Sequence, residues 1–518
     1  MNTQQFPQTV GQALDRTAAR HHKTAYIDRG RSYSWQEVQQ MSAVLARNLR
    51  ALGLGKGDRI GVILPNGIEW VLTYLAAARM GAVVVGLSIR YRDSELDFMM
   101  QDSQIKAVLA PLAFAKLDYV QYLSQARERC PTLEHLMFLG DPGEGRGHDF
   151  LMLLKAQAAV PDSQEESVEA DDLLLIIYTS GTTGKPKAAG LTHGSQLASA
   201  RAQCEHTKAC ADDLLQLSLP LNHVGGITCG VLTLMLAGAG AEFVPVFNAD
   251  TVLEMAGVNP PTMLTGVPTM FALLLLKPEF ASADWSRLRL VIIGGSNVEP
   301  GLLSRLQQLL PGVVFMNLYG LSETSGAIVM TPWNADQHSL LHSIGRPLAG
   351  AEVCVAGPDG RPLPAGEVGE LCYRSASVIP GYVGAQRDEG AFDALGWLHS
   401  GDLGYLDEQG QIYLMGRKKD MFIQGGFNVY PAEVEGVLGL HPGVLMAAGL
   451  GVPDPVLGEV GRYYVVAKPG VELSEAELQA HCLAHLADYK APRQIVFRSE
   501  LPMTPAGKIQ KALLRGSP

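Results

Sequence analysis

A chain of 518 residues is too long for a single core, and at roughly 100 to 200 residues per domain we expect about three compact units. Hydrophobic residues make up 47% and charged residues 18%; this balance excludes a disordered chain, and the length excludes a small disulfide scaffold. The net charge of -11 provides no overall positive field, so we expect no nucleic acid as a partner.

The cysteines and the N-terminus bear on location. The seven cysteines include no C-x-x-C pair, and the first residues lack the basic start and apolar run of a signal peptide. The charge-free stretch 224–241 is about as long as a short membrane span, but it is rich in glycine and has no flanking Lys or Arg, so we predict a buried helix. We therefore expect a cytoplasmic protein with no integral membrane segment.

In chain order, the first part alternates strands with helices. Residues 58–66 have a buried-strand pattern, 67–82 predict a helix that ends near Gly81, and 83–86 predict a second strand. Apolar runs at 106–110 and 135–139 continue the rhythm. Such alternation predicts a parallel sheet covered by helices on both faces.

The same pattern returns from 173 to about 340 and predicts a second, similarly built subdomain that begins with the strand at 173–178. Between roughly 345 and 415 the segments become short and turn-rich, which predicts a small antiparallel, barrel-like unit. The last hundred residues indicate a small α+β domain. We thus predict an α/β protein in which two doubly wound subdomains and the barrel-like unit form a large domain, 1–416, and 417–518 form a second one.

A decamer from Tyr178 to Lys187 carries the strongest chemical signal. It reads YTSGTTGKPK and directly follows the apolar strand LLLII. Its glycines permit unusual backbone angles, its hydroxyls and N–H groups can surround phosphate oxygens, and its lysines supply positive charge. The loop is not a Walker A motif, because only two residues separate its glycines and Pro186 follows Lys185. The segment predicts a phosphate cradle whose members are Thr179, Ser180, Gly181, Thr182, Thr183, Gly184 and Lys187.

Six further motifs follow the decamer in chain order, and with it the whole chain resembles the adenylate-forming superfamily of acyl-CoA synthetases, luciferases and nonribosomal adenylation domains. They are NHVGG at 222–226, NLYGLSE at 317–323, SGD at 400–402, GRKKD at 416–420, GGFNVYP at 425–431 and PAGK at 505–508. The likeness is greatest to fatty or aryl acid-CoA ligases, and it implies ATP, Mg²⁺ and coenzyme A as cofactors.

The resemblance assigns the nucleotide contacts. Tyr319, with Asn317 and Gly320 beside it, would stack on adenine. Ser322 would hydrogen-bond the α-phosphate, and Glu323, a hard carboxylate, would bind Mg²⁺.

Sugar and hinge contacts lie in the SGD and GRKKD motifs. The resemblance implies that the Asp402 carboxylate accepts hydrogen bonds from the ribose hydroxyls, that Arg417 reaches the same sugar or the phosphate, and that Lys419 is the pivot between the two domains.

The two half-reactions depend on the C-terminal domain. The resemblance implies that Lys508 bridges the substrate carboxylate and the α-phosphate, because a mobile cation must offset the repulsion between two anions. The side-chain-free edge Gly425–Gly426 would pass the pantetheine arm of CoA after the small domain rotates. His223 would separate the acyl site from the thiol tunnel.

The acyl pocket is expected to be roomy and apolar. No acid that could hold an α-ammonium group stands at 222–224, and no Arg that could clamp a second carboxylate stands at 225–228 or 294–296. We therefore predict a monocarboxylic acid, either fatty, aryl or alicyclic. The expected acyl contacts are His223, Gly226, Ile227, Gly295 and Ser296.

Alternatives stay open at this point. An enzyme that passes its acyl group to an acyl carrier protein instead of CoA would share every ATP motif, as would a luciferase-like oxygenase. A nonenzymatic relative would be expected to lose Lys508 or Glu323, and both are present. No G-x-S-x-G hydrolase motif and no zinc-ligand spacing is found. A homodimer is compatible with the sequence.

Overall fold

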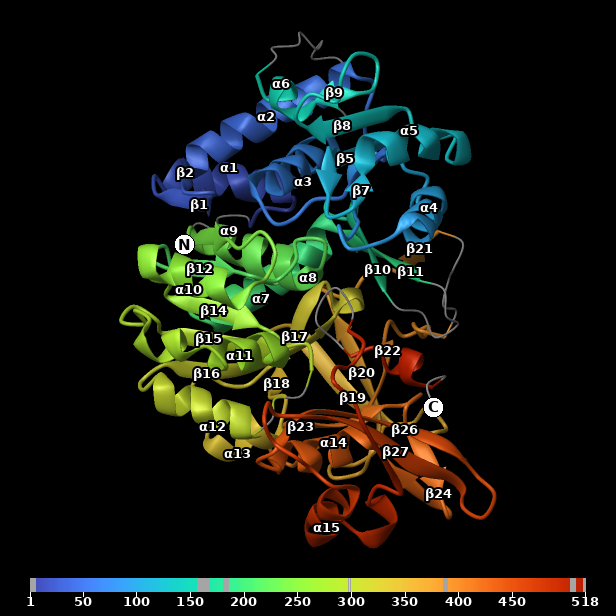
Figure 1. The fold of residues 1–518 in the computed structure, drawn as a ribbon. Coiled ribbons are helices and arrows are strands. Elements are labelled where there is room, and N and C mark those ends of the chain that lie inside the picture. Colours follow the sequence, from blue (N-terminus) through green and yellow to red (C-terminus); the bar gives the residue numbers. More distant parts are fainter. Residues whose placement is uncertain are drawn as a thin grey trace.

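The computed structural model describes residues 6–155, 167–179, 186–296, 298, 300–384, 390–503 and 509–515. Two large sheets with their helices fill the upper and middle parts of Figure 1, and a small antiparallel sheet leads into the C-terminal unit below them. The predicted fold class is thereby confirmed.

The first large sheet has eight strands. In spatial order they are β21 (Tyr382–Val383), β11 (Lys187–Thr192), β10 (Leu173–Thr179), β4 (Val83–Gly86), β3 (Arg59–Val62), β5 (Ala107–Pro111), β8 (His135–Leu139) and β9 (His148–Asp149). Strands β10, β4, β3, β5 and β8 pair in parallel, whereas β11 is antiparallel to β10. Apolar side chains of α4 (Asp93–Asp102) and α5 (Tyr119–Arg129) cover one face, and those of α2 (Trp35–Ala51) and α3 (Ile68–Met80) cover the other.

The second large sheet has nine strands. Their order is β18 (Arg346–Pro347), β17 (Gly326–Met330), β16 (Val314–Leu321), β15 (Leu290–Gly294), β14 (Met263–Gly266), β12 (Leu214–Leu217), β13 (Gly240–Phe243), β1 (Thr24–Asp28) and β2 (Arg31–Ser34). The helices α10 (Ala249–Val258), α11 (Pro268–Leu275) and α12 (Pro300–Leu309) pack on one face. On the other face, α1 (Val10–Arg20), α7 (His193–His206) and α9 (Thr233–Ala237) share one core with the first sheet.

We had expected the second subdomain to begin at residue 173. The chain does not divide between the two subdomains at that point. Strand β10 belongs to the first sheet, where Leu175 lies opposite Val84 of β4. Strand β1, near the N-terminus, belongs to the second sheet, where Tyr26 lies opposite Ala241 of β13. An apolar alternating pattern predicts that a strand exists, but the sheet it joins is decided by long-range pairing.

The charge-free stretch 224–241 is only partly the predicted buried helix. It begins with α8 (Val224–Gly226), continues as a π-helical turn over Ile227–Leu232 and ends as α9. Gly238, at φ 67°, closes the helix in the left-handed region, and β13 starts at Gly240. Among the described residues, no helix combines the length and the apolar composition that a bilayer crossing requires.

The remaining chain forms two sheets that are antiparallel except for one parallel pair of strands in the C-terminal sheet. The small unit is a four-stranded sheet in the order β19 (Ala351–Ala356), β20 (Gly369–Ser375), β22 (Leu398–Leu406) and β23 (Ile412–Arg417). The C-terminal sheet contains β25 (Phe427–Val429), β24 (Phe422–Gln424), β27 (Gly458–Ala467) and β26 (Val444–Asp454), with β28 (Gln494–Phe497) added parallel to β27. It shares a core with α14 (Pro431–Leu440) and α15 (Glu475–His485).

Candidate active site

Several of the predicted site residues lie where strands of the second sheet end. The carboxyl ends of β14, β15 and β16 lead into Val267, Gly295 and Ser322, respectively. Ligands of α/β proteins bind at this edge of a parallel sheet, because the loops that follow the strands converge there. The NLYGLSE motif and the predicted acyl contacts Gly295 and Ser296 therefore lie at the same edge.

Tyr319, Asp402 and Arg417 form a polar cluster, in which the first two residues are buried and Arg417 is half-exposed. The Tyr319 hydroxyl donates to Asp402 Oδ2 at 2.5 Å, and Arg417 Nε lies 2.8 Å from Asp402 Oδ1. The antiparallel register of β22 and β23 places Asp402 directly opposite Arg417. Only 3% of Asp402 is exposed, so its charge depends on this pairing. The cluster joins the second sheet to the small sheet.

Ionisation within this cluster follows from burial and charge. Burial, reinforced by the neighbouring Tyr373 and Asp402, raises the pKa of Tyr319 well above its usual value, so this hydroxyl keeps its proton and acts as a donor. Burial alone would lower the pKa of Arg417, but the Asp402 carboxylate reverses this and raises it. Both neighbours of Asp402 therefore present donors to its two oxygens.

Glu323 has a partner that the sequence did not reveal. It lies in a 3-10 turn over Ser322–Thr324, and the Tyr382 hydroxyl donates to its Oε1 at 2.6 Å. Tyr382 comes from edge strand β21 of the first sheet, and Lys187 Nζ lies 5.7 Å from the centre of its ring. A residue of the first sheet therefore positions Glu323, although the turn that carries Glu323 follows β16 of the second sheet.

A divalent cation fits this donor set only together with a nucleotide. Within the described ranges, no group of three or more His, Cys, Asp or Glu side chains could hold a metal ion. One carboxylate does suit Mg²⁺, which takes most of its remaining ligands from substrate phosphates and water.

The ends of the phosphate loop are described, but its middle is not. Thr179 closes β10 and Lys187 opens β11, and the two residues are paired across the strands. Lys187 is only 6% exposed. The predicted contacts Ser180, Gly181, Thr182, Thr183 and Gly184 lie outside the described residues, and so does Lys508.

Asn317 does not face the strand ends with its side chain. Its Nδ2 donates to the Leu340 carbonyl at 2.7 Å and to the Ser343 carbonyl at 3.1 Å. These carbonyls lie in and just after α13 (Gln337–His342). The side chain therefore braces α13 against β16, and this differs from the nucleotide contact that we had expected.

Gly425 and Gly426 lie away from this edge. They form the turn between β24 and β25 with φ values of 59° and 89°, which favour glycine. Figure 1 shows β24 at the far lower end of the molecule, well separated from β14 and β15. Lys419 lies in the turn between β23 and β24. In this arrangement the glycine edge does not meet the other site residues.

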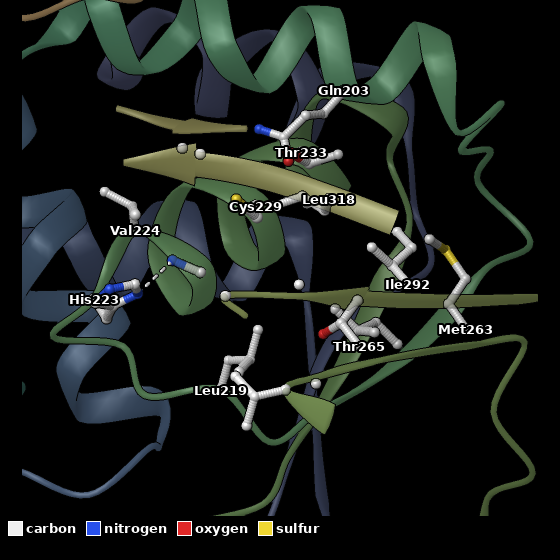
Figure 2. A pocket seen from close by; sticks show the side chains of 18 of the residues that line it. Gln203, Leu219, His223, Val224, Cys229, Thr233, Met263, Thr265, Ile292 and Leu318 are labelled. Carbon is white, nitrogen blue, oxygen red and sulfur yellow. Dashed lines mark hydrogen bonds between the residues drawn. The ribbon is translucent and has the colours of Figure 1, made fainter. Parts of the chain in front are cut away.

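A cavity runs along β14, β15 and β16, between these strands and the helices α7 and α9 (Figure 2). It encloses about 880 Å³, open space at its mouth included. Three adjacent strands contribute side chains at alternate positions, as expected for one face of a sheet. The lining consists of Gln203, Thr207, Leu215, Leu219, Pro220, His223, Val224, Gly225, Cys229, Thr233, Leu234, Met263, Thr265, Gly266, Val267, Ile292, Gly294, Gly295, Leu318, Gly320 and Gly326.

Two of the five predicted acyl contacts line this cavity. His223 directly precedes α8 and caps it, because its Nδ1 accepts from the Gly225 N–H at 3.1 Å. Gly295 also lines the cavity, whereas Ser296 is exposed and outside the lining. Gly226 and Ile227 point elsewhere: a Cβ on Gly226 would lie 2.2 Å from the Pro220 carbonyl oxygen, and Ile227 is fully buried in the core between the sheets.

The sequence reasoning missed much of the lining. Met263, Thr265, Ile292 and Leu318 could have been found from the alternation along three neighbouring strands, had the strand order been known. Gln203 could not have been found from the sequence, because no motif surrounds it in α7.

Comparison with known proteins identifies the family. Residues 14–383 match the model of the AMP-binding enzymes, and residues 433–508 match the model of their C-terminal domain. The chain belongs to the AMP-binding enzyme family, and the predicted membership of the adenylate-forming superfamily is confirmed.

Its relatives include CoA ligases of ring acids. The chain is 34% identical to a feruloyl-CoA synthase of Amycolatopsis sp. over 95% of this chain and 96% of the relative. It is also 34% identical to a methyl-dioxo-octahydro-indenyl-propanoyl:CoA ligase of Rhodococcus jostii, over 98% of both chains. The crystal structure of the anthranilate CoA ligase AuaEII in complex with anthranoyl-AMP has a TM-score of 0.89 at 25% identity, covering 98% of this chain and 97% of that one.

Proposed function

We propose that the protein is an ATP-dependent acid-CoA ligase for a monocarboxylic acid, with a fatty, aryl or alicyclic acyl group. The observation that carries this proposal is a cavity without a charged Asp, Glu, Lys or Arg in its lining, beside the carboxyl ends of three strands, one of which, β16, carries the NLYGLSE motif. The relatives named for ring acids support the same class.

In the first half-reaction, a carboxylate oxygen of the acid attacks the α-phosphorus of ATP, and pyrophosphate leaves. We assign adenine stacking to Tyr319 and ribose binding to Asp402, with Arg417 holding the carboxylate in place. Bound Mg²⁺, anchored by Glu323, would supply charge neutralisation at the phosphates. Lys508 is proposed to lie between the two reacting anions.

In the second half-reaction, the CoA sulfur attacks the acyl carbonyl carbon of the adenylate, and AMP leaves. The separation of Gly425–Gly426 from the cavity supports a rotation of residues 417–518 against residues 1–416, with Lys419 as the pivot. His223, at the start of α8, is proposed to stand between the acyl group and the thiol. We also keep the cytoplasm as the proposed location, because unpaired cysteines suit a reducing compartment.

Pyrophosphate release tests the first half-reaction, and acceptor choice tests the second. A panel of fatty, aryl and alicyclic acids is incubated with MgATP alone, with CoA, and with a phosphopantetheinylated acyl carrier protein. Acid-dependent pyrophosphate release and an acyl-CoA product support the ligase. Acyl transfer to the carrier protein but not to CoA would show that the carrier protein is the acceptor. Absence of pyrophosphate release with every acid would refute the proposal.

A further inference from the structure

The cavity beside β14 is closed at one end. Along β15 and β16, the lining runs from Gly294 and Gly320 at the strand ends back to Ile292 and Leu318, which are two residues earlier. Along β14 the lining runs four residues, from Val267 back to Met263, which at ~3.3 Å per residue corresponds to a depth of about 13 Å. Such a depth suits a ring with a linker better than a long, extended fatty chain.

Met263 lies at the far end, and an ion pair between Arg289 and the buried Asp213 lies beside it. Arg289 Nη2 lies 4.0 Å from Met263 Sδ and 2.5 Å from Asp213 Oδ2. Asp213 is 4% exposed, so the pair is costly to disturb. A longer acyl chain would have to push Met263 onto these two charges.

One polar group in the lining is without a partner. Thr265 Oγ1 is buried and makes no hydrogen bond to any described residue. By contrast, the Thr207 hydroxyl donates to the Gln203 carbonyl at 2.7 Å, and the Thr233 hydroxyl donates to the Thr228 carbonyl at 2.9 Å. An unsatisfied buried hydroxyl destabilises the fold, and a valine at this position would avoid that cost.

Gln203 lies across the cavity from Thr265. In Figure 2, the side chain of Gln203 extends from α7 on one side of the cavity, and that of Thr265 extends from β14 on the other side. The amide is held in place, because its Nε2 donates to Ser199 O at 3.2 Å and to Ser199 Oγ at 3.0 Å. Across the cavity from this amide, the Thr265 hydroxyl is free to bond an oxygen-bearing group on a bound acid.

We propose that this cavity selects a compact ring acid that carries an uncharged oxygen substituent, a carbonyl or a hydroxyl, and that Thr265 is the residue that recognises this substituent. The inference rests on the proposed acid-CoA ligase function and narrows its substrate class. A carbonyl accepts a hydrogen bond from Thr265 Oγ1, and a hydroxyl can also donate to it. Either group removes the penalty that a bare hydrocarbon ring leaves in place.

The test uses matched acids and matched variants. Specificity constants for thioester formation are measured with phenylpropanoate and hydroxyphenylpropanoate, with cyclohexylpropanoate and its ring ketone, and with hexadecanoate. In the wild type we expect at least one oxygenated acid to exceed its bare partner by about ten-fold or more, and hexadecanoate to rank below the ring acids.

The variants then assign the preference to one hydroxyl. Thr265→Val should bring the ratio of oxygenated to bare acid to about one, while Thr265→Ser should keep it. Thr73→Val, which removes a buried hydroxyl that donates to the Glu69 carbonyl at 2.8 Å within α3 and lies outside the cavity lining, should leave the ratio as in the wild type.

Failure of this inference can be told apart from failure of the ligase function. If bare ring acids or hexadecanoate form thioesters best, or if Thr265→Val keeps the wild-type ratio, the polar subsite is refuted while the ligase stands. If no acid in the panel gives pyrophosphate release or a thioester, the proposed function itself fails.

Discussion

The Tyr382 hydroxyl donates a 2.6 Å hydrogen bond to Glu323 Oε1, which links an edge strand of the first sheet to the carboxylate that follows β16 of the second. If Glu323 anchors Mg²⁺, Tyr382 fixes which of its oxygens faces the metal. The contact thus couples the packing of two sheets to the geometry of one ligand.

Glu323→Ala is expected to lower acid-dependent exchange of pyrophosphate into ATP by about 100-fold, because the metal loses its protein anchor. Tyr382→Phe keeps the Glu323 carboxylate but removes the hydrogen bond to its Oε1, so we expect the exchange rate to fall by about ten-fold. Exchange rates are measured over a Mg²⁺ titration.

The two variants also differ in how they respond to Mg²⁺. Excess Mg²⁺ should restore the exchange rate of Tyr382→Phe more fully than that of Glu323→Ala, because only Tyr382→Phe retains the Glu323 carboxylate as a metal ligand. Wild-type exchange in Glu323→Ala would remove Glu323 from the metal site.

Charged acyl groups should be rejected. The cavity lining contains no Asp, Glu, Lys or Arg, and burying an unpaired charge costs several kcal/mol. Monocarboxylates should therefore exceed dicarboxylates and amino acids of similar size by roughly 100-fold or more in specificity constant. Pyrophosphate release with matched acid pairs measures the difference, and malonate or an amino acid as the best substrate would contradict the assignment.

Stability should depend on pH through a histidine far from the chemistry. His193 is fully buried at the start of α7, and its Nδ1 accepts from the Val10 N–H at 3.2 Å. Burial lowers the pKa of His193 to about 4. Between about pH 6.5 and pH 4 the unfolded chain binds a proton that the folded protein does not, so the free energy of unfolding falls as the pH drops, by about 3 kcal/mol in total.

Urea denaturation of the wild type and of His193→Gln at about pH 7.5 and about pH 5 checks this expectation. The variant should lose less stability than the wild type on acidification. His485→Gln, a substitution at an exposed histidine of α15, serves as the control and should keep the wild-type difference. An unchanged difference in His193→Gln would show that other groups dominate.

The sequence predicted local features well and long-range ones poorly. The pairing of Asp402 with Arg417 follows from two neighbouring strands, so motifs close in the chain also meet in space. Tyr382 and Thr265 depend on strand order, which local pattern does not specify. Strand β10 shows the same limit, because its apolar run predicted a strand but its partner β4 lies almost ninety residues earlier.

Different substitutions should impair the two half-reactions separately. Lys508→Ala is expected to abolish acyl-adenylate formation, because the repulsion between carboxylate and phosphate is no longer offset, yet it should still convert synthetic acyl-adenylate and CoA to thioester. Gly426→Trp should do the reverse, since it blocks the approach of the thiol and leaves adenylation intact. Lys419→Pro should stiffen the pivot and slow the second step more than the first.

Gly426 has a matched control for backbone strain. Gly426, at φ 89°, and Gly470, at φ 77°, both lie in turns of the C-terminal unit where a Cβ would meet nothing within 4 Å. Gly470→Trp therefore introduces similar strain without a role in thiol transfer, so it should slow neither half-reaction selectively. Both half-reactions are measured for all four variants. Equal damage to the two steps in Lys508→Ala, or intact thioester formation in Gly426→Trp, would rule out the alternation of the C-terminal domain between two chemistries.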